Sequence, residues 1–263
     1  MKKILKISGM LGILLIFVFL SFGCTKNVEM VRANTPEEAI NLFNTYNSEN
    51  NVEEMVKLYS NEYIDYIGYD ANQIMKVMKK NRKDLNIKYS TVKGIEDINE
   101  NLKQAVVTIS AMVDDEEVTE DYVYAVIKED NGWAVSPDGI TECINFDVPV
   151  DKEKELNLNL VKEAVLFDGA LIRVNLYNNT NNSYVFGTTD EKTEIVVETT
   201  EGTFTSIVEE PQKIEKKARN YFIAKLENLK GEITKVTVTS VFDVDKDGNA
   251  ILDTKRDITV YSK

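Results

Sequence analysis

Three alternating carboxylates near the end of the chain have the residue types and the spacing that suit metal chemistry. Asp243, Asp245 and Asp247 are followed by Gly248, the pattern that opens a calcium-binding loop. Their oxygen atoms could converge on a hard cation, and the glycine allows the sharp turn of such a loop. The twelfth position, however, is Thr254 in place of the bidentate Glu. The pattern predicts either a weak calcium site or a β-hairpin closed by an Asp/Gly turn, and no other cofactor is indicated.

The composition argues against several other kinds of chemistry. The 263 residues include no histidine, which removes the commonest general base and most zinc sites. The formal net charge is −13, and it becomes −16 without residues 1–23, which carry three lysines and no acid. The body of the protein, meaning the residues after 23, therefore repels phosphate backbones and anionic headgroups, so we expect no nucleic-acid partner. The apolar fraction of 43% is that of a folding chain.

The N-terminus predicts where the protein resides. Three lysines in the first six residues precede an apolar run from Ile7 to Phe22, and Gly23 and Cys24 follow it. A basic start, an apolar middle and a small residue are typical of a secretory signal. The boundary cysteine resembles the lipobox of bacterial lipoproteins, although Ser21 stands where that family most often has Leu. The resemblance implies cleavage before Cys24 and diacylation of its thiol; an uncleaved membrane anchor is the alternative.

Both alternatives place the body at the outer face of the cell membrane, because the lysines stay inside. Residues 24–33 show no periodic apolar pattern and are predicted to form a tether. The only other cysteine is Cys143, so acylation of Cys24 leaves no intramolecular disulfide. Because Cys143 lies among apolar neighbours in the sequence, we expect a small buried side chain and not a reactive thiol.

The first half of the body changes from helical to strand periodicity. Thr35-Pro36-Glu37-Glu38 carries an N-cap, a proline at the first helical position and a capping-box glutamate. Helix starts of similar type at Asn51 and Asp70 bring the predicted number of helices to three. Apolar residues then alternate, which predicts strands over 87–92, 105–113 and 122–126, a hairpin turn at the acidic residues 114–117 and a last strand at Trp133. Helices followed by an antiparallel sheet indicate an α+β fold.

The second half alternates almost throughout. Turn signals such as Asp168-Gly169, Glu201-Gly202 and Lys230-Gly231 separate the apolar segments, which predicts about eight short strands and favours a β-sandwich. The predicted organisation is a signal peptide (1–23), a tether (24–33), an α+β domain (34–142), a linker (143–155) and a β-sandwich (156–263).

Two resemblances refine this organisation. The stretches "TPEEAINLFNTYNSENNVEEMVKLYS" and "YAVIKEDNGWAVS" resemble the NTF2-like, cystatin-like family, which implies three helices on a curved antiparallel sheet. The stretch "IRVNLYNNTNNSYVFG" is similar to the Ig-like sandwiches of Gram-positive surface lipoproteins. Both resemblances describe folds, and a fold does not identify a function.

The NTF2-like resemblance also implies a cone whose open end is often lined by aromatic residues. Tyr59, Tyr63, Tyr66 and Tyr69 cluster between the second and third predicted helices and could bind an apolar or sugar-like ligand there. Packing of the helices on the sheet uses the same residue types, so a filled core is the alternative. For an enzyme of this family, Asp65 beside Tyr66 is the nearest acid/base candidate, although nothing in the spacing selects it.

Together these patterns predict an extracytoplasmic, membrane-anchored lipoprotein that acts as a non-catalytic binding or interaction module. Its expected partners are the membrane, through the lipid anchor, and a protein or small ligand in the cell envelope. The alternatives are a solute-binding lipoprotein that uses the cone of the first domain and an isomerase or hydrolase of the NTF2-like type.

Overall fold

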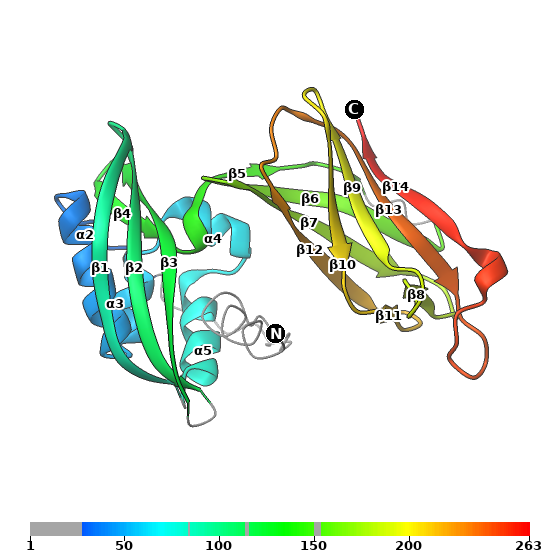
Figure 1. Cartoon of the computed structure of the whole chain (residues 1–263), viewed down its shortest axis with the longest axis horizontal. Helices are drawn as coiled ribbons and strands as arrows, with labels where there is room; N and C mark the ends of the chain where they lie inside the picture. Colours follow the sequence, from blue (N-terminus) through cyan, green and yellow to red (C-terminus); the bar gives the residue numbers. More distant parts are fainter. Residues whose placement is uncertain (1–27, 84, 114–115, 150–153) are drawn as a thin grey trace. The chain divides into compact units, whose positions relative to one another are not determined.

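The computed structural model describes residues 28–83, 85–113, 116–149 and 154–263, which divide into two compact units between Glu142 and Cys143 (Figure 1). The predicted signal peptide (1–23), Cys24 and residues 25–27 of the tether lie outside the described residues, as do 114–115 and 150–153. Among the described residues, no helix is both long enough and apolar enough to cross a lipid bilayer.

The described residues of the first unit begin with four helices: α2 (Pro36–Ser48), α3 (Val52–Lys57), α4 (Asn61–Ile67) and α5 (Ala71–Asn81). Each begins at a residue whose side chain accepts a hydrogen bond from a backbone N–H of the first turn, namely Thr35, Asn51, Ser60 and Asp70. The prediction of three helices was wrong because α4 was overlooked: Tyr63 stands three residues after its cap Ser60, where the starts of the other helices have Glu or Gln. Its ends are nevertheless encoded, by the Ser60 cap and by Gly68 in the left-handed conformation.

A four-stranded antiparallel sheet follows, in the order β1 (Asn86–Asn99), β2 (Leu102–Val113), β3 (Glu116–Glu129) and β4 (Gly132–Ser136). The predicted alternation in β2 is confirmed, because one face of the strand is buried at Ala105, Val107, Ile109 and Ala111. Helix α2 packs against this sheet (Figure 1). The acidic turn is shorter than predicted: Val113 pairs with Glu116 and Met112 with Glu117, so both glutamates belong to β3.

The end of the predicted tether is part of the first unit. Ala33 forms an antiparallel bridge with Trp133 of β4, with N–H···O distances of 3.0 and 2.8 Å, and the Val31 N–H donates to the Lys57 carbonyl at 2.9 Å. Ala33 is 3% exposed. The boundary predicted at residue 34 was therefore wrong, because backbone pairing to the edge of β4 does not depend on side-chain periodicity.

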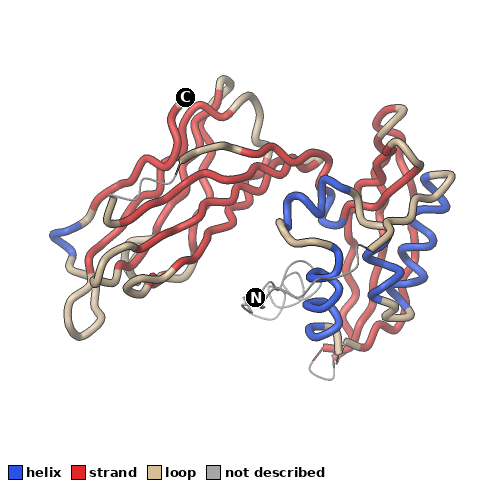
Figure 2. The backbone as a smooth tube through the Cα atoms, turned by 180° about the vertical axis from the view of Figure 1, so that it is seen from behind, coloured by secondary structure: helices blue, strands red, loops and turns tan. Residues whose placement is uncertain are grey.

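The second unit consists of two sheets around one core. One sheet has the order β12 (Arg219–Glu227), β7 (Gly169–Asn178), β6 (Leu156–Leu166) and β5 (Ile140–Asn145). The other has the order β10 (Thr203–Val208), β9 (Thr193–Thr199), β13 (Ile233–Asp243), β8 (Tyr184–Phe186) and β11 (Gln212–Ile214), with β14 (Arg256–Ser262) beside β13. Residues of both sheets, such as Ile172, Val174, Ile195 and Val236, share a single buried cluster. The arrangement is that of a β-sandwich, and strands form nearly all of its regular structure (Figure 2).

The connection between the two halves differs from the predicted linker. Strand β5 includes residues 143–145 and pairs with β6, so the first residues of the predicted linker are part of a sheet. Cys143 lies in β5 and is partly exposed, whereas a buried thiol was predicted. The position alternates with its neighbours along an extended strand, which the apolar residues around it did not reveal.

Candidate functional site

The interior of the first unit gathers most of the predicted aromatic cluster. Tyr59, Tyr63 and Tyr66 are buried, and Tyr69 is half-buried. The ring of Tyr59 lies edge-on to that of Tyr63 with a centroid distance of 4.9 Å. Phe43 of α2 connects the cluster to the sheet, because its ring centroid is 5.9 Å from Tyr59 and 5.3 Å from Tyr124 of β3. Three of the four predicted ligand-binding tyrosines are therefore packed against other side chains of the core.

Burial controls the chemistry of these hydroxyl groups. It raises the pKa values of Tyr59, Tyr63 and Tyr124 above the ordinary value for tyrosine, and the nearby Asp138 carboxylate raises each of them further. The Tyr59 hydroxyl donates a hydrogen bond to the Met78 sulfur at 3.2 Å. The hydroxyl groups are consequently neutral at physiological pH and can act as hydrogen-bond donors but not as bases.

Arg82 enters the same interior from the end of α5. It is only 7% exposed, and burial lowers the pKa of its guanidinium. Nη2 donates to the Asn47 side chain at 2.6 Å and to the Asn47 carbonyl at 3.3 Å, while Nη1 lies 3.3 Å from the Met55 sulfur. Nε has no hydrogen-bond partner within the described part of the chain. This role could not be predicted, because Arg82 follows Lys79 and Lys80 in one basic run.

The carboxylate whose charge acts on the tyrosines is that of Asp138. It is half-buried in the short 3₁₀ turn after β4, with a φ of 60°. Asp65, the predicted acid/base candidate, is exposed, whereas its neighbour Tyr66 is buried. Adjacent residues of a helix point in different directions, so the structure does not assemble the predicted Asp65–Tyr66 pair in the interior.

The acidic motif of the second unit forms a turn between β13 and β14. Asp243 makes an ion pair with Arg256 at 2.9 Å, and Asp245 Oδ1 accepts hydrogen bonds from the backbone N–H groups of Asp247 and Asn249 at 2.9 and 2.8 Å. These backbone hydrogen bonds, chiefly that from Asn249, lower the pKa of Asp245. Asp247 is exposed. Over the described ranges, no three His, Cys, Asp or Glu side chains are grouped so that they could hold a metal ion, so the three carboxylates are not brought together.

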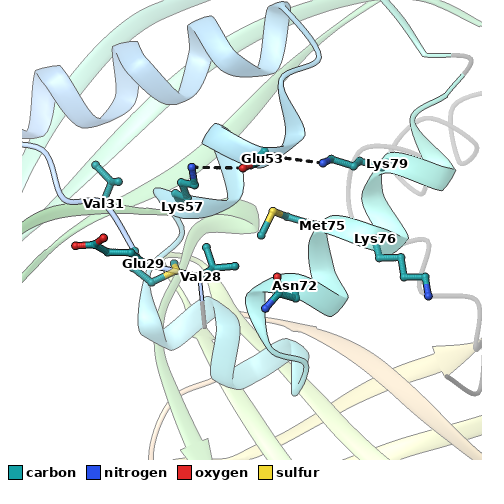
Figure 3. A pocket seen from close by; sticks show the side chains of 10 residues that line it. Val28, Glu29, Val31, Glu53, Lys57, Asn72, Met75, Lys76 and Lys79 are labelled. Carbon is teal, nitrogen blue, oxygen red and sulfur yellow. Dashed lines mark hydrogen bonds and ion pairs between the residues drawn. The ribbon is translucent and has the colours of Figure 1, made fainter. Parts of the chain in front are cut away.

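A hollow of about 810 Å³ lies where the chain enters the first unit. Val28 and Val31 line it from the N-terminal segment, and Met75, Lys76 and Lys79 line it from α5 (Figure 3). Across the hollow, Glu53 lies 3.6 Å from Lys57 and 3.5 Å from Lys79. This combination of apolar and basic side chains was not predicted, because it depends on the docked N-terminal segment.

A second hollow of about 410 Å³ contains the contact that holds this segment in place. The Arg32 guanidinium donates to Glu129 Oε2, with Nε at 2.7 Å and Nη2 at 2.6 Å. Asn61 donates to the same carboxylate from its backbone N–H at 2.8 Å and from its side chain at 2.9 Å. Both charged side chains are largely buried, with exposures of 7% for Arg32 and 15% for Glu129. We call this set of three residues the Arg32 clamp.

Comparisons with known proteins found partial structural likenesses. No protein-family profile matches the sequence, and no curated protein is significantly similar to it. One similar solved structure is an NTF-2 like protein of unknown function from Shewanella oneidensis MR-1, with 15% identity over 38% of this chain and 90% of the other and a TM-score of 0.30. Another is a sec-c motif containing protein from Psychrobacter arcticus, with 13% identity over 45% of this chain and 66% of the other and a TM-score of 0.34.

Proposed function

We propose that this protein is an extracytoplasmic lipoprotein, anchored in the outer face of the cell membrane, whose two units act as non-catalytic binding or interaction modules. The observation that carries the proposal is Gly23-Cys24 directly after an apolar run with a basic start. In the lipoproteins that this segment resembles, the cysteine becomes the diacylated N-terminus. One acyl chain alone binds a membrane only marginally, so the diacyl modification is what makes the attachment stable.

The packed core of the first unit and the folds of both units support an interaction role. The buried tyrosines of the first unit contact each other and Phe43, and the carboxylate of Asp65 lies outside this cluster. The helices followed by an antiparallel sheet, with Gly132-Trp133 in β4, agree with an NTF2-like assignment of the first unit. The two sheets around one core agree with an Ig-like assignment of the second. Such modules present strand edges and loops for contact with partners.

Two buried polar atoms favour a second candidate function, the binding of a small ligand inside the first unit. Arg82 Nε and Ser136 Oγ are buried and have no hydrogen-bond partner among the described residues. Buried polar atoms are normally hydrogen-bonded, so a bound ligand could supply the missing partners. An anion would suit the guanidinium. Inorganic phosphate and acetate should then raise the melting temperature of the wild type more than that of Arg82→Lys. Equal shifts in the two proteins would exclude this candidate.

The anchoring proposal is tested by labelling with a fatty-acid analogue in a bacterial host. Cys24→Ala should abolish both the label and removal of the signal, because it removes the thiol that is acylated. Cys143→Ala is the matched control, since it removes the only other cysteine and should leave the label intact. Undiminished labelling of Cys24→Ala, or a mature chain that begins at another residue, would overturn the proposal.

A further inference from the structure

One helix face differs in charge from the rest of the protein. From Ala71 to Lys83 the sequence contains five basic residues and no acidic one, in a chain that has 44 acidic against 31 basic residues. Ile74 and Met75 of α5 are buried in the first unit. The exposed lysines along α5 and just after it are Lys76, Lys79, Lys80 and Lys83, and we call them the basic face.

Most of the charge of the basic face is not neutralised. Among the described residues, an ion pair is seen only for Lys79, which lies 3.5 Å from Glu53, and both side chains of that pair are more than half exposed. Exposed pairs of this kind are weak and are screened by salt. The ammonium groups of Lys76, Lys80 and Lys83 therefore remain available to an external anion.

The basic face lies beside the point where the chain enters the first unit. Val28 lines the same hollow as Lys76 and Lys79 (Figure 3). The segment is fixed there by the hydrogen bond from Val31 to Lys57 and by the Arg32 clamp. Only three residues separate Val28 from Cys24, and the four chain steps between them span at most about 14 Å. A lipid on Cys24 would consequently hold this side of the unit near the bilayer surface.

We propose that the basic face binds the anionic headgroups of the membrane that holds the lipid anchor, and so orients the first unit on the bilayer. The inference rests on the proposed anchoring at Cys24. Clusters of four or more lysines next to a membrane attachment bind anionic lipids, and a lipid chain with a basic patch makes a stable two-part attachment. The net charge of −16 does not prevent this, because charges beyond about 10 Å are largely screened at physiological salt.

The test measures binding of the basic face to lipid vesicles, with a protein that lacks the lipid anchor. The chain from residue 24 to 263 is prepared with Cys24→Ser and mixed at physiological ionic strength, where the distant acidic residues are screened, with vesicles of phosphatidylglycerol and phosphatidylcholine, or of phosphatidylcholine alone. We expect co-sedimentation with the anionic vesicles only, and its loss at high salt. The triple variant Lys76→Gln/Lys79→Gln/Lys80→Gln should bind at least about tenfold more weakly, since each lysine contributes to the attraction.

The matched control is Lys216→Gln/Lys225→Gln/Lys230→Gln, which changes the net charge equally at exposed lysines of the second unit and should bind as the wild type does. Unchanged melting temperatures show that both variants are folded. No binding to anionic vesicles, equal weakening by the two triples, or displacement by millimolar inorganic phosphate would overturn the inference. Failure of the lipid anchor is detected separately, because labelling of Cys24 does not depend on these lysines.

Discussion

Glu129 is the residue on which docking of the N-terminal segment depends. Its two oxygen atoms accept hydrogen bonds from Arg32 and from both N–H groups of Asn61, within a largely buried contact. Removing the charge leaves the largely buried Arg32 guanidinium without its counter-charge, so Glu129→Gln should lower the free energy of unfolding by about 1–3 kcal/mol. Urea unfolding measures the change.

Asp97→Asn is the matched control for Glu129→Gln. It also removes a carboxylate that pairs with a basic side chain of the first unit, but Asp97 is 82% exposed in its pair with Lys103. The expected loss of stability is therefore no more than about 0.5 kcal/mol. An equal effect of the two substitutions would show that the Arg32 clamp contributes nothing beyond a surface ion pair.

The buried tyrosines make a prediction at alkaline pH. Burial raises the folded-state pKa values of Tyr59, Tyr63, Tyr122 and Tyr124, while in the unfolded chain they titrate near about pH 10. The unfolded state then loses protons first, so their contribution to stability is complete below about pH 10 and falls as the pH rises further. Tyrosinate absorbance should include a late step that coincides with loss of the tertiary circular dichroism signal. Titration of all 12 tyrosines near pH 10 in a folded protein would contradict this.

Clusters of residues that lie close together in the sequence could be predicted better than the contacts that a residue makes in the fold. The tyrosine cluster is visible in the sequence because aromatic residues recur at short intervals. Arg82 and Asp138 could not be recognised, because each becomes distinctive only when other elements pack around it. Arg82 contacts Asn47 and Met55, which lie 35 and 27 residues away in the sequence, and no local pattern contains such contacts.

At the scale of the elements, the turn between β13 and β14 determines which partners the carboxylates of the acidic motif have. Asp243 pairs with Arg256 and Asp245 closes the turn through backbone hydrogen bonds, so two of the three carboxylates already have partners. Millimolar Ca²⁺ should therefore raise the melting temperature of the second unit no more than Mg²⁺ does at equal ionic strength. A calcium-specific rise that Asp245→Asn/Asp247→Asn cancels would contradict this prediction and restore the calcium site.

Strands with clean alternation and helices whose N-cap is followed three residues later by Glu or Gln could be predicted, whereas elements without these signals could not. The alternation of β2 and the N-caps of α2, α3 and α5 were evident in the sequence. Helix α4 was missed because Tyr63, and not Glu or Gln, stands three residues after its cap Ser60. The strand-like pairing of Ala33 was missed because it rests on backbone hydrogen bonds to Trp133. Backbone pairing partners far apart in the chain leave little trace in composition.

At the scale of the whole molecule, the two units should fold independently. The described members of the buried cluster of the second unit lie between Leu158 and Val260. Fragments 28–142 and 143–263 should each melt cooperatively. A fragment that begins at residue 34 should melt more than about 5 °C lower than one that begins at residue 28, because it lacks the pairing of Ala33 and the Arg32 clamp. Equal melting temperatures would show that residues 28–33 add no stability.

The mass of the N-terminal peptide of the protein extracted from membranes tests the anchoring most directly. The lipoprotein assignment requires a mature chain that begins at Cys24 and carries a diacylglyceryl group, with Cys143 unmodified. The same peptide from Cys24→Ala cells should be absent and replaced by the uncleaved N-terminus. An N-terminal peptide that begins elsewhere, or one with an unmodified Cys24 in the membrane fraction, would contradict the proposed function.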